Sequence, residues 1–361
     1  MKKVIVSVTN DLATDQRVQR VCQSLHSWGY EVLLVGRRLP ASPSFEQAYR
    51  YKRMRLIFKK SLLFYAEYNL RLFLLLLFYK ADILLANDLD TLPANWLAAK
   101  IKRIKLVFDS HEYFPETPEI YKRHFVKSVW QGIEQLCVHR CDVSYTVSQS
   151  IADIFENKYN LKFKVIRNVP FRLNNQWELT KANPYIIYQG SVNIGRGLEL
   201  MFNALKIDPC LHLVIAGDGP ELINLKGKAE ILNIKKQVKF LGRLLPKELK
   251  EWTSGASLGI SIEEPLGISY ISALPNKLFD YIQAGIPALV SDFPEMGGIV
   301  AQYGIGMILK ERNPVNLARI LQMMITDVVL RETWKANLTI AAEELCWEKE
   351  SQKLRELFSF V

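Results

Sequence analysis

Short apolar runs of strand length alternate with helical segments along most of this chain. VIVSV (4–8) precedes a segment in which apolar residues recur with a period of 3.6, and EVLLVG (31–36) follows that segment. The later runs in the first half are ADILLAND (81–88), KLVFDSHE (105–112), VSYTVS (143–148) and KVIRNVP (164–170). This order is typical of βαβ units, so we predict an α/β protein with a doubly wound parallel sheet.

A second series of the same kind follows the polar, aperiodic segment FRLNNQWELTKANP (171–184). Its strand-like runs are YIIYQGS (185–191), LHLVIAGDGP (211–220), VKFLGRL (238–244), SLGISI (257–262) and PALVSD (287–292). A chain of 361 residues with 49% hydrophobic composition is long enough for two cores. The predicted organisation is an N-terminal domain at 1–170, a linker at 171–184, a C-terminal domain at 185–335, and a C-terminal helix at 336–361 that packs on the N-terminal domain. The strand ends of the two sheets are expected to line a cleft.

Several classes of protein are disfavoured by motifs that the sequence lacks. The first βα turn, VTNDLATDQR, contains no glycine, which argues against a dinucleotide site of the G-x-G-x-x-G type. A P-loop is also absent, so phosphoryl transfer by that device is not expected. The five cysteines are scattered without the spacing of a zinc site, which favours reduced thiols in a cytoplasmic protein. The first apolar run is too short for a signal peptide, so export is not expected.

A set of motifs over almost the whole chain resembles the glycosyltransferases of family 4. In order they are TNDLATDQRV (9–18), ANDLDTLPA (86–94), FDSHEYFPE (108–116), YQGSVNIGRGLELM (188–201), VIAGDGP (214–220), VKFLGR (238–243) and PNKLFDYIQAGIPALVSD (275–292). The resemblance implies the GT-B fold, in which two Rossmann-like domains with parallel sheets face each other across a cleft. It also implies transfer of a sugar from a nucleotide-sugar to an acceptor, usually with retention at the anomeric carbon and without a metal.

The stretch LPNKLFDYIQAG (274–285) is predicted to begin a helix that binds a diphosphate. The first N–H groups of a helix have no intrahelical partner and lie at the positive end of its dipole, so the amides near Asn276, Lys277 and Leu278 form an anion site. The Lys277 side chain adds a positive charge. Asp280 lies one turn further on the same face, where it can accept hydrogen bonds from ribose hydroxyls.

By resemblance, Asp280 corresponds to the second carboxylate of the family's E-x7-E motif. The alternative is that Asp280 only complements the helix dipole. The sequence departs from the motif at Ser272, where the first glutamate is expected, and Glu263 and Glu264 lie too far upstream for that spacing. Contacts with the donor sugar are therefore less defined than contacts with the diphosphate.

The glycine turn YQGSVNIGRG is expected to lie opposite this helix. In the family, an arginine and a lysine that follow the strand clamp the diphosphate, and here Ser191 stands at the first position and Arg196 at the second, after Gly190. Gly242 and Arg243 end the strand VKFLG and are expected to hold the base through the backbone. An ordinary turn at Gly242 and a solvated Arg196 are the alternatives.

At the strand ends of the first domain, His111 is the main candidate. The resemblance implies that it binds the transferring sugar, for which an imidazole offers both a donor and an acceptor. Asp88 and Asp90 imitate a D-x-D metal motif, but we expect a structural or acceptor-binding role and no metal site. Asp15 and Arg17, in the first loop, are expected to meet donor phosphate or acceptor hydroxyls. No protein nucleophile is assigned, since the leaving phosphate itself can accept the acceptor's proton.

The expected function is therefore a glycosyltransferase of polysaccharide biosynthesis that uses an NDP-sugar, a glycan or lipid-linked glycan acceptor, and no cofactor. A nucleotide-sugar epimerase of the same architecture and a non-catalytic protein that binds sugar nucleotides are the alternatives. The net charge of +10 alone does not favour nucleic acid, because no recognition motif or row of stacking aromatics accompanies it.

A membrane surface is a further expected partner. Residues 1–60 carry twelve Lys and Arg against four Asp and Glu, and six of these cations lie between Arg50 and Lys60. The apolar segment that follows, 62–79, is interrupted by Glu67, Asn69 and Arg71, so we predict a buried helix and not a membrane span. The basic segment 50–60 is predicted to bind an anionic membrane reversibly, which would make the protein cytoplasmic and peripheral.

Overall fold

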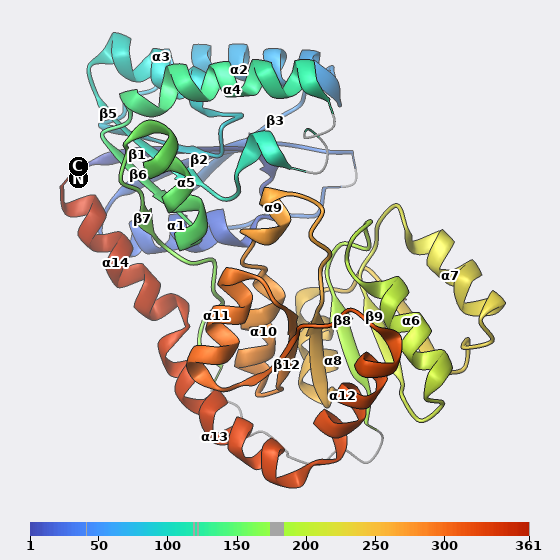
Figure 1. The fold of residues 1–361 in the computed structure, drawn as a ribbon. Coiled ribbons are helices and arrows are strands. Elements are labelled where there is room, and N and C mark those ends of the chain that lie inside the picture. The colour runs from blue at the N-terminus through green and yellow to red at the C-terminus, as the bar shows by residue number, and fades with distance from the viewer. Residues whose placement is uncertain (41, 118–119, 121–122, 174–183, 361) are drawn as a thin grey trace. The chain divides into compact units, whose positions relative to one another are not determined.

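The computed structural model describes residues 1–40, 42–117, 120, 123–173 and 184–360, and the chain divides into two compact units (Figure 1). The N-terminal unit is Met1–Asn168 together with Glu350–Val361, and the C-terminal unit is Val169–Lys349. The N-terminal domain, predicted to end at residue 170, thus ends at 168. The C-terminal segment that returns to it, predicted to begin at 336, begins at 350, inside the last helix. Most of the predicted linker, at 174–183, lies outside the described residues.

The N-terminal unit contains a seven-stranded sheet in the order β3-β2-β1-β4-β5-β6-β7, with every neighbouring pair parallel. Its strands are β1 Lys3–Asp11, β2 Glu31–Arg37, β3 Arg50–Met54, β4 Ile83–Asn87, β5 Lys105–Ser110, β6 Val143–Thr146 and β7 Lys164–Val165. All five residues of β4, ILLAN, are buried, as expected for a central strand with both faces covered. The strand order reverses between β1 and β4, which is where ligands bind in folds of this type.

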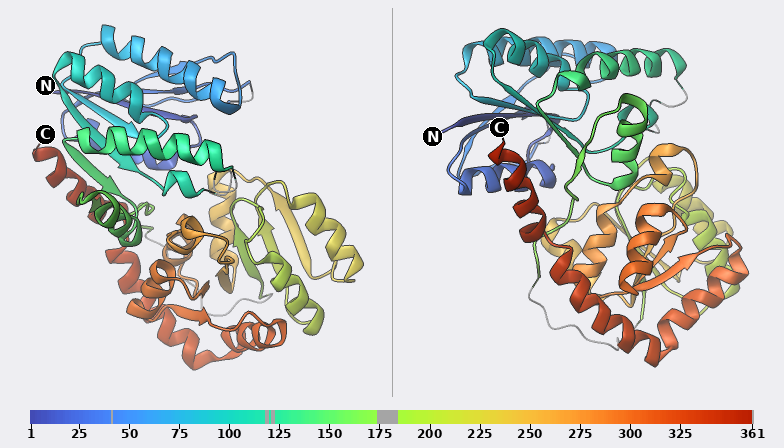
Figure 2. Two further views of the ribbon diagram at one scale, coloured as in Figure 1. Left: turned by 45° about the horizontal axis from the view of Figure 1, so that its top comes forward. Right: turned by 60° about the vertical axis from the view of Figure 1, so that its left-hand side comes forward.

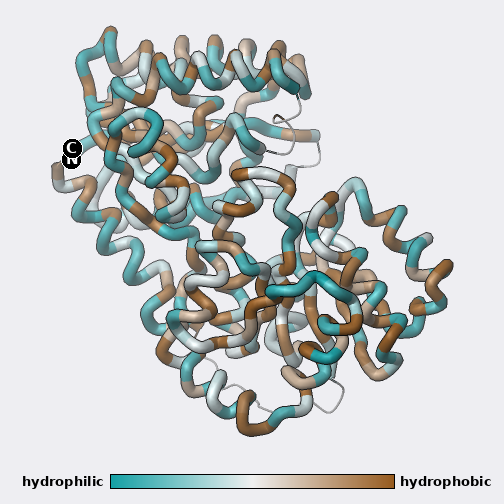
Figure 3. The backbone as a smooth tube through the Cα atoms, in the orientation of Figure 1, coloured by the Kyte–Doolittle hydropathy of each residue, from teal (hydrophilic) through white to brown (hydrophobic). Residues whose placement is uncertain are grey.

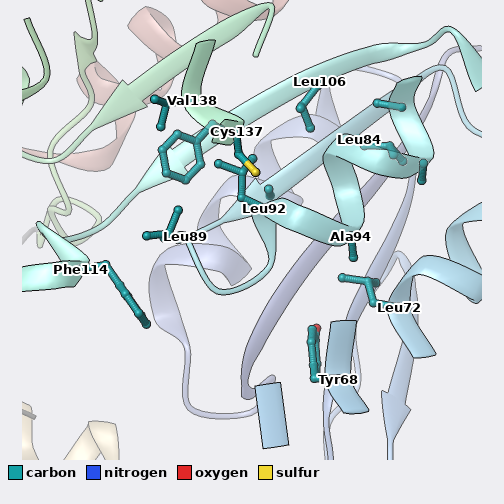
Figure 4. Packing of buried hydrophobic residues seen from close by; sticks show 14 of the residues in the cluster. Tyr68, Leu72, Leu84, Leu89, Leu92, Ala94, Leu106, Phe114, Cys137 and Val138 are labelled. Carbon is teal, nitrogen blue, oxygen red and sulfur yellow. The ribbon is translucent and has the colours of Figure 1, made fainter. Parts of the chain in front are cut away.

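Helices cover both faces of this sheet. They are α1 Gln16–Ser27, α2 Ser61–Phe78, α3 Leu92–Lys102, α4 His124–Cys137, α5 Gln149–Tyr159 and α14 Trp347–Ser359, with short 3-10 turns η1 Phe114–Glu116 and η2 Val138–Arg140. Helices α2, α3 and α4 lie side by side over one face, and α1 lies on the other (Figures 1 and 2). Figure 4 shows the core under the first group, where Leu72 of α2 and Ala94 of α3 pack near Leu84 of β4.

The C-terminal unit contains a six-stranded parallel sheet in the order β10-β9-β8-β11-β12-β13. Its strands are β8 Ile186–Gln189, β9 Leu213–Ala216, β10 Val238–Gly242, β11 Leu258–Ser261, β12 Ala288–Ser291 and β13 Gly306–Leu309. Its helices are α6 Leu198–Ile207, α7 Leu222–Ile231, α8 Pro246–Gly255, α9 Ile268–Ile271, α10 Asn276–Ala284, α11 Pro294–Tyr303, α12 Pro314–Thr326 and α13 Val328–Glu344. The order reverses between β8 and β11, so this unit repeats the arrangement of the first.

Helix α2 is apolar both on the face that it buries and on the face that it exposes. It is long and apolar enough to cross a membrane by length and composition, a test that the core helix of a soluble protein also passes. Its buried residues include Tyr68, whose hydroxyl donates to the carbonyl of Val8, and Leu72, so one face belongs to the core. The opposite face carries Leu70 and Phe78, which are 60% and 83% exposed. In the orientation of Figure 3, α4 lies in front of α2, and hydrophobic and hydrophilic residues alternate along the helices at this edge of the unit.

Candidate active site

Both units place polar residues at the carboxyl ends of the two strands that flank the reversal of strand order. In the N-terminal unit these are the ends of β1 and β4, with the end of β5 beside β4. In the C-terminal unit they are the ends of β8 and β11, and the start of α10 follows. Each unit therefore has a candidate half-site.

In the C-terminal unit, Arg196 and Lys277 converge on one carboxylate. The Lys277 Nζ lies 2.7 Å from the Oε1 of Glu263, and the Arg196 Nη1 lies 3.7 Å from the same oxygen. Glu263 follows β11 and is 1% exposed. Burial raises the pKa of Glu263, but the charges of Lys277 and Arg196 outweigh this effect and lower it, so the side chain is an anion. Two predicted site residues, 81 positions apart in the sequence, thus share one buried anion.

The side chains around this cluster fix the positions of its charges. The Ser261 hydroxyl donates to the second carboxylate oxygen of Glu263 at 2.9 Å. The Lys277 Nζ lies 4.2 Å from the centre of the Tyr188 ring, and the Arg196 guanidinium carbon lies 4.9 Å from the centre of the Tyr270 ring. Cation–π contacts of this kind hold both cations in defined places.

Helix α10 begins where it was predicted to begin, after Pro275. The amide of Leu278 donates to the Pro275 carbonyl, and the Leu278 side chain is fully buried, so this residue has a structural role. The amides of Asn276 and Lys277 are the first of the helix and have no intrahelical acceptor. With the Lys277 ammonium beside them, they form the positive end of the predicted diphosphate site.

Asp280 lies one turn into α10 and accepts a hydrogen bond of 2.7 Å from the side-chain amide of Gln189. Gln189, the last residue of β8, in turn accepts from the Thr253 hydroxyl at 2.7 Å. Asp280 is therefore tied to the end of a central strand. Ser272, where the E-x7-E pattern expects a glutamate, is buried at the C-terminal end of α9.

The loop after β8 carries Gly190 and Ser191, both exposed, and it packs against the GDGP turn after β9. A Cβ atom at Gly217 would lie 1.8 Å from the carbonyl oxygen of Gly190, so only glycine allows these two loops to touch. The Ser191 carbonyl accepts from the Tyr188 hydroxyl at 2.6 Å. The close packing of the loops is a sufficient reason for the glycines of GDGP.

The predicted contacts to the base lie at the end of β10. Gly242 has a φ of +67°, in the left-handed region, and a Cβ there would meet no atom within 4 Å. Arg243 is exposed. The structure therefore shows a turn with open space beside it, and the assignment of Gly242 and Arg243 to the base stays a prediction.

In the N-terminal unit, His111 lies between two carboxylates. Its Nδ1 is 3.1 Å from the Oδ2 of Asp88, and its Nε2 is 3.1 Å from the Oδ2 of Asp109. Burial lowers the pKa of His111, but the two carboxylates outweigh burial and raise it well above the usual value. The side chain is an imidazolium with both ring nitrogens engaged, so the expectation of a free donor and a free acceptor is wrong.

Arg17 belongs to the support of this cluster. It is 2% exposed, its Nη2 lies 2.8 Å from the Oδ1 of Asp109, and its Nη1 donates to the carbonyl of Ile166. Burial raises the pKa of Asp109, but Arg17 and His111 lower it to about 2. The prediction that Arg17 meets a phosphate is corrected, because its guanidinium is already bonded within the unit. Asp15 is the N-cap of α1, where its side chain accepts from the amide of Val18.

Asp88 and Asp90 differ in their surroundings. The Asp88 backbone has a φ of +60°, and one side-chain oxygen accepts from the amide of His111 at 2.7 Å. Asp90 is buried and accepts from the Thr9 hydroxyl, and burial, reinforced by the charge of Asp88, raises its pKa to about 7. Within the described ranges, no three His, Cys, Asp or Glu side chains are grouped closely enough to hold a metal ion.

Three functional candidates were missed in the sequence. Glu263 was set aside because its spacing to Asp280 does not match E-x7-E, although its position directly after β11 is a strand-end signal. Asp109 was not selected, because its partner Arg17 is 92 positions away. Arg312 donates to the carbonyls of Glu263 and Ile262 at 2.9 and 3.0 Å and holds that loop, and no local pattern marks it.

Two Rossmann-like units with their polar clusters at the strand ends define the GT-B class of protein, and solved structures of that fold superpose on the chain. Sucrose-phosphate synthase from Thermosynechococcus elongatus matches with a TM-score of 0.81 at 14% identity, covering 99% of this chain and 98% of that one. HepE of Anabaena, in complex with UDP-glucose, matches with a TM-score of 0.75 at 16% identity over the whole of both chains.

The sequence families agree with the fold. Residues 15–170 match the family described as Glycosyltransferase Family 4, and residues 171–339 match Glycosyl transferases group 1. A segment of 118 residues is 29% identical to the alpha-monoglucosyldiacylglycerol synthase of Streptococcus pneumoniae; it is 32% of this chain and spans only about a quarter, 25%, of that relative's length. The chain thus has the GT-B fold, with a region that matches family 4 followed by a region that matches group 1 of the glycosyltransferases.

Proposed function

We propose that this protein transfers a sugar from a nucleotide-sugar to a glycan or lipid-linked glycan, with retention and without a metal. The observation that carries the proposal is the convergence of Arg196 and Lys277 on Glu263 beside the first turn of α10. Two cations that share one carboxylate retain positive charge for a second anion. Such preorganised charge stabilises the negative charge that develops on a departing diphosphate.

The relatives favour a uridine nucleotide and a hexose. HepE was solved with UDP-glucose, and the pneumococcal relative is named as a monoglucosyl lipid synthase. Polar contacts by Asp280 to ribose and by Gly242 and Arg243 to the base complete the proposed donor site. His111 is proposed to act on the transferring sugar by its fixed positive charge, since its ring nitrogens are both bonded to carboxylates.

A panel of nucleotides tests the donor site first. UDP, GDP, ADP and CMP are compared by thermal shift, because a ligand that binds only the folded state raises the melting temperature according to its affinity. We expect UDP to give the largest shift and Arg196→Ala to abolish most of it. An equal response of the variant and the natural protein would remove Arg196 from the site.

Turnover distinguishes transfer from the two alternatives. A glycosyltransferase releases UDP from UDP-sugar faster when an acceptor is added, whereas an epimerase converts the nucleotide-sugar with no acceptor present. Binding without any turnover would favour a non-catalytic protein.

Metal independence has its own test. We propose that the start of helix α10 and the side chains of Arg196 and Lys277 neutralise the diphosphate in place of a metal, so a chelator should leave the rate unchanged. Loss of activity with a chelator and recovery with manganese would contradict this, and would make Asp88 and Asp90 candidate ligands.

We also propose that the N-terminal unit docks on an anionic membrane surface, so that the protein is cytoplasmic and peripheral. The exposed face of α2 is apolar along its length, and its large exposed side chains are Leu62, Leu63, Leu70, Leu74 and Phe78. On this face Glu67 and Arg71 pair with each other at 2.6 Å, which lowers the cost of placing them near lipid. An apolar face of this kind, bordered by cations, is typical of an interfacial helix.

The basic segment 50–60 offers fewer cations for membrane binding than its sequence suggested. Arg50–Met54 forms β3, at the edge of the sheet, and Arg53 makes a largely buried ion pair with Asp11 at 2.8 Å. Arg55, Lys59 and Lys60 lie beyond β3 and are exposed, and each cation near an anionic surface contributes about 1 kcal/mol.

Vesicle flotation tests this proposal. The protein should float with vesicles of phosphatidylcholine and phosphatidylglycerol at low salt, and Leu70→Ser/Leu74→Ser should release it. The control Ile223→Ser/Ile231→Ser changes two side chains of α7 that are each 81% exposed, and it should bind like the natural protein. Equal binding to pure phosphatidylcholine would show that charge is not involved, and absence of binding at low salt would reject the surface.

A further inference from the structure

A cavity of about 340 Å³ lies in the N-terminal unit beyond the ends of β2 and β3, at the start of α2. Its lining contains four cations, Arg37, Arg38, Arg55 and Lys59, and no aspartate or glutamate. The rest of the lining is apolar and includes Phe64. Neither the predicted donor site nor the His111 cluster uses this cavity.

The four cations of this cavity differ from the neighbouring Arg53 in their ion pairs. Within the described ranges, none of them forms an ion pair with an acidic side chain, whereas the adjacent Arg53 pairs with Asp11. The Arg37 Nε is buried and has no hydrogen-bond partner, and its guanidinium carbon lies 5.0 Å from the centre of the Phe64 ring. Unpaired cations that line a cavity repel one another, and an anion relieves that repulsion. The planar donors of arginine match the oxygens of a phosphate in pairs.

A second cavity, of about 560 Å³, adjoins the first and shares Arg37, Lys59 and Phe64 with it. Much of its lining is apolar, with Phe114 and Trp130 among it, but unlike the first cavity it also includes Asn10, Asp88 and other polar groups at the ends of β1 and β4. We call it the polar cavity for these groups. Carboxylate and amide groups accept hydrogen bonds from sugar hydroxyls. Polar groups at the strand ends and the four cations therefore line adjoining cavities, and apolar side chains line both.

We propose that the cationic cavity binds the phosphate group of an amphiphilic acceptor. The hydroxyl-bearing head would occupy the polar cavity, the phosphate would bind Arg37, Arg38, Arg55 and Lys59, and the apolar chain would leave along Phe58 and Leu39. The inference rests on the proposed function in that it concerns the acceptor of the same transfer. The ligand chemistry is a phosphate ester joined to an apolar chain; free phosphate is the other source of the same anion.

Calorimetry with three ligands tests the proposal. Octyl phosphate, octyl glucoside and inorganic phosphate are each titrated below any micelle-forming concentration, so that no lipid surface is present. We expect octyl phosphate to bind at least about tenfold more tightly than the other two, since only it has both charge and chain. Equal binding of inorganic phosphate would make this a free-phosphate site and overturn the assignment to an amphiphile. Absence of octyl phosphate binding would reject the site.

Two double variants locate the binding. Arg37→Gln/Arg55→Gln and the more exposed pair Arg38→Gln/Lys59→Gln should each weaken octyl phosphate by about tenfold or more. The control Lys162→Gln/Lys164→Gln removes the same charge from exposed positions of the same unit and should bind like the natural protein. Unchanged binding in a folded double variant would place the ligand elsewhere.

UDP binding, measured on the same proteins, separates this inference from the proposed function. We expect UDP affinity to stay the same in both double variants, because the donor cluster lies in the C-terminal unit. Octyl phosphate binding without UDP binding in the natural protein would count against the donor site and leave the phosphate site standing. UDP binding without octyl phosphate binding would reject the phosphate site and leave the donor site standing.

Discussion

The two polar clusters are built with opposite charges. In the N-terminal unit a cation, His111, lies between the carboxylates of Asp88 and Asp109, while in the C-terminal unit an anion, Glu263, lies between Lys277 and Arg196. Arg17 balances the first cluster, which then has two cations and two carboxylates. The second cluster has two cations on one carboxylate. The first cluster is balanced and holds His111, whereas the second has more cations than carboxylates, and we propose that this excess charge serves the diphosphate.

The largest effect is expected from a substitution that breaks the balanced cluster around His111. Arg17→Leu should lower the free energy of unfolding by about 3–5 kcal/mol, because it leaves the buried Asp109 with one cation fewer. Urea denaturation measures the loss, and hydrogen exchange of the amides assigns it to the N-terminal unit. The exposed pair of Lys3 and Glu31 provides the control, since Lys3→Met should cost less than about 1 kcal/mol. Similar losses for the two variants would contradict the difference between buried and exposed pairs.

The His111 cluster should affect the turnover rate and not the affinity for the nucleotide. His111→Ala should lower the turnover rate by about a hundredfold, as removal of one electrostatic group from a catalytic site does, with nucleotide affinity within about twofold of the natural protein. Steady-state rates and UDP titrations give the two numbers. His111→Gln keeps hydrogen bonding without the charge and should stay as slow. A fall in nucleotide affinity equal to the fall in rate would assign His111 to phosphate binding or to structure.

In the unbalanced cluster around Glu263, substitutions should lower the affinity for the donor. Arg196→Ala and Lys277→Ala should each weaken donor binding by roughly ten- to a hundredfold, which is about 1.5–3 kcal/mol for a lost charge-assisted contact. Lys247→Ala, an exposed cation of α8, is the matched control and should leave the donor Kd unchanged. Donor kinetics that stay the same in folded Arg196→Ala would show that the excess charge does not serve the diphosphate.

The smallest expected effect concerns pH and the N-terminal unit. The pKa of Asp90 is about 7 in the folded protein and about 3.9 when unfolded, so its proton is held more tightly in the folded state, and its contribution to stability is lost as the pH rises from about 4 to about 7. Asp90→Asn removes this dependence and should gain about 1.4 kcal/mol on the natural protein between pH 5 and pH 6. Urea denaturation at the two pH values measures the difference. Parallel pH profiles would show that Asp90 is ionised in the fold.

Eleven of the strands lie within apolar runs that the sequence shows, because central strands of a parallel sheet are buried on both faces. The two that were missed are β3, RYKRM, and β13, GMIL, and each lies at the edge of its sheet. Strand β3 is held by backbone pairing along one side, so its side chains need no apolar pattern. Strand β13 is apolar but is only four residues long, and so gives a weaker signal.

The site was predictable where it depends on local chemistry and not where it depends on long-range contacts. The start of α10 and the position of His111 at a strand end follow from the neighbouring residues. The pairing of Arg17 with Asp109, and of Glu263 with both Lys277 and Arg196, joins residues far apart in the sequence, and their roles changed once the partners were known. Arg17, predicted as a ligand for phosphate, is a supporting residue for this reason.

Helix α14 has a consequence for the order in which the protein folds during synthesis. Its last turns belong to the N-terminal unit, where Leu354 and Phe358 are buried, Glu350 accepts from the amide of Arg167, and the carbonyl of Phe358 accepts from the Tyr30 hydroxyl. The ribosome makes these residues only after it has synthesised the whole C-terminal unit. The unit that begins first is therefore completed last, and a fragment that stops at residue 168 would expose the apolar surface that α14 covers.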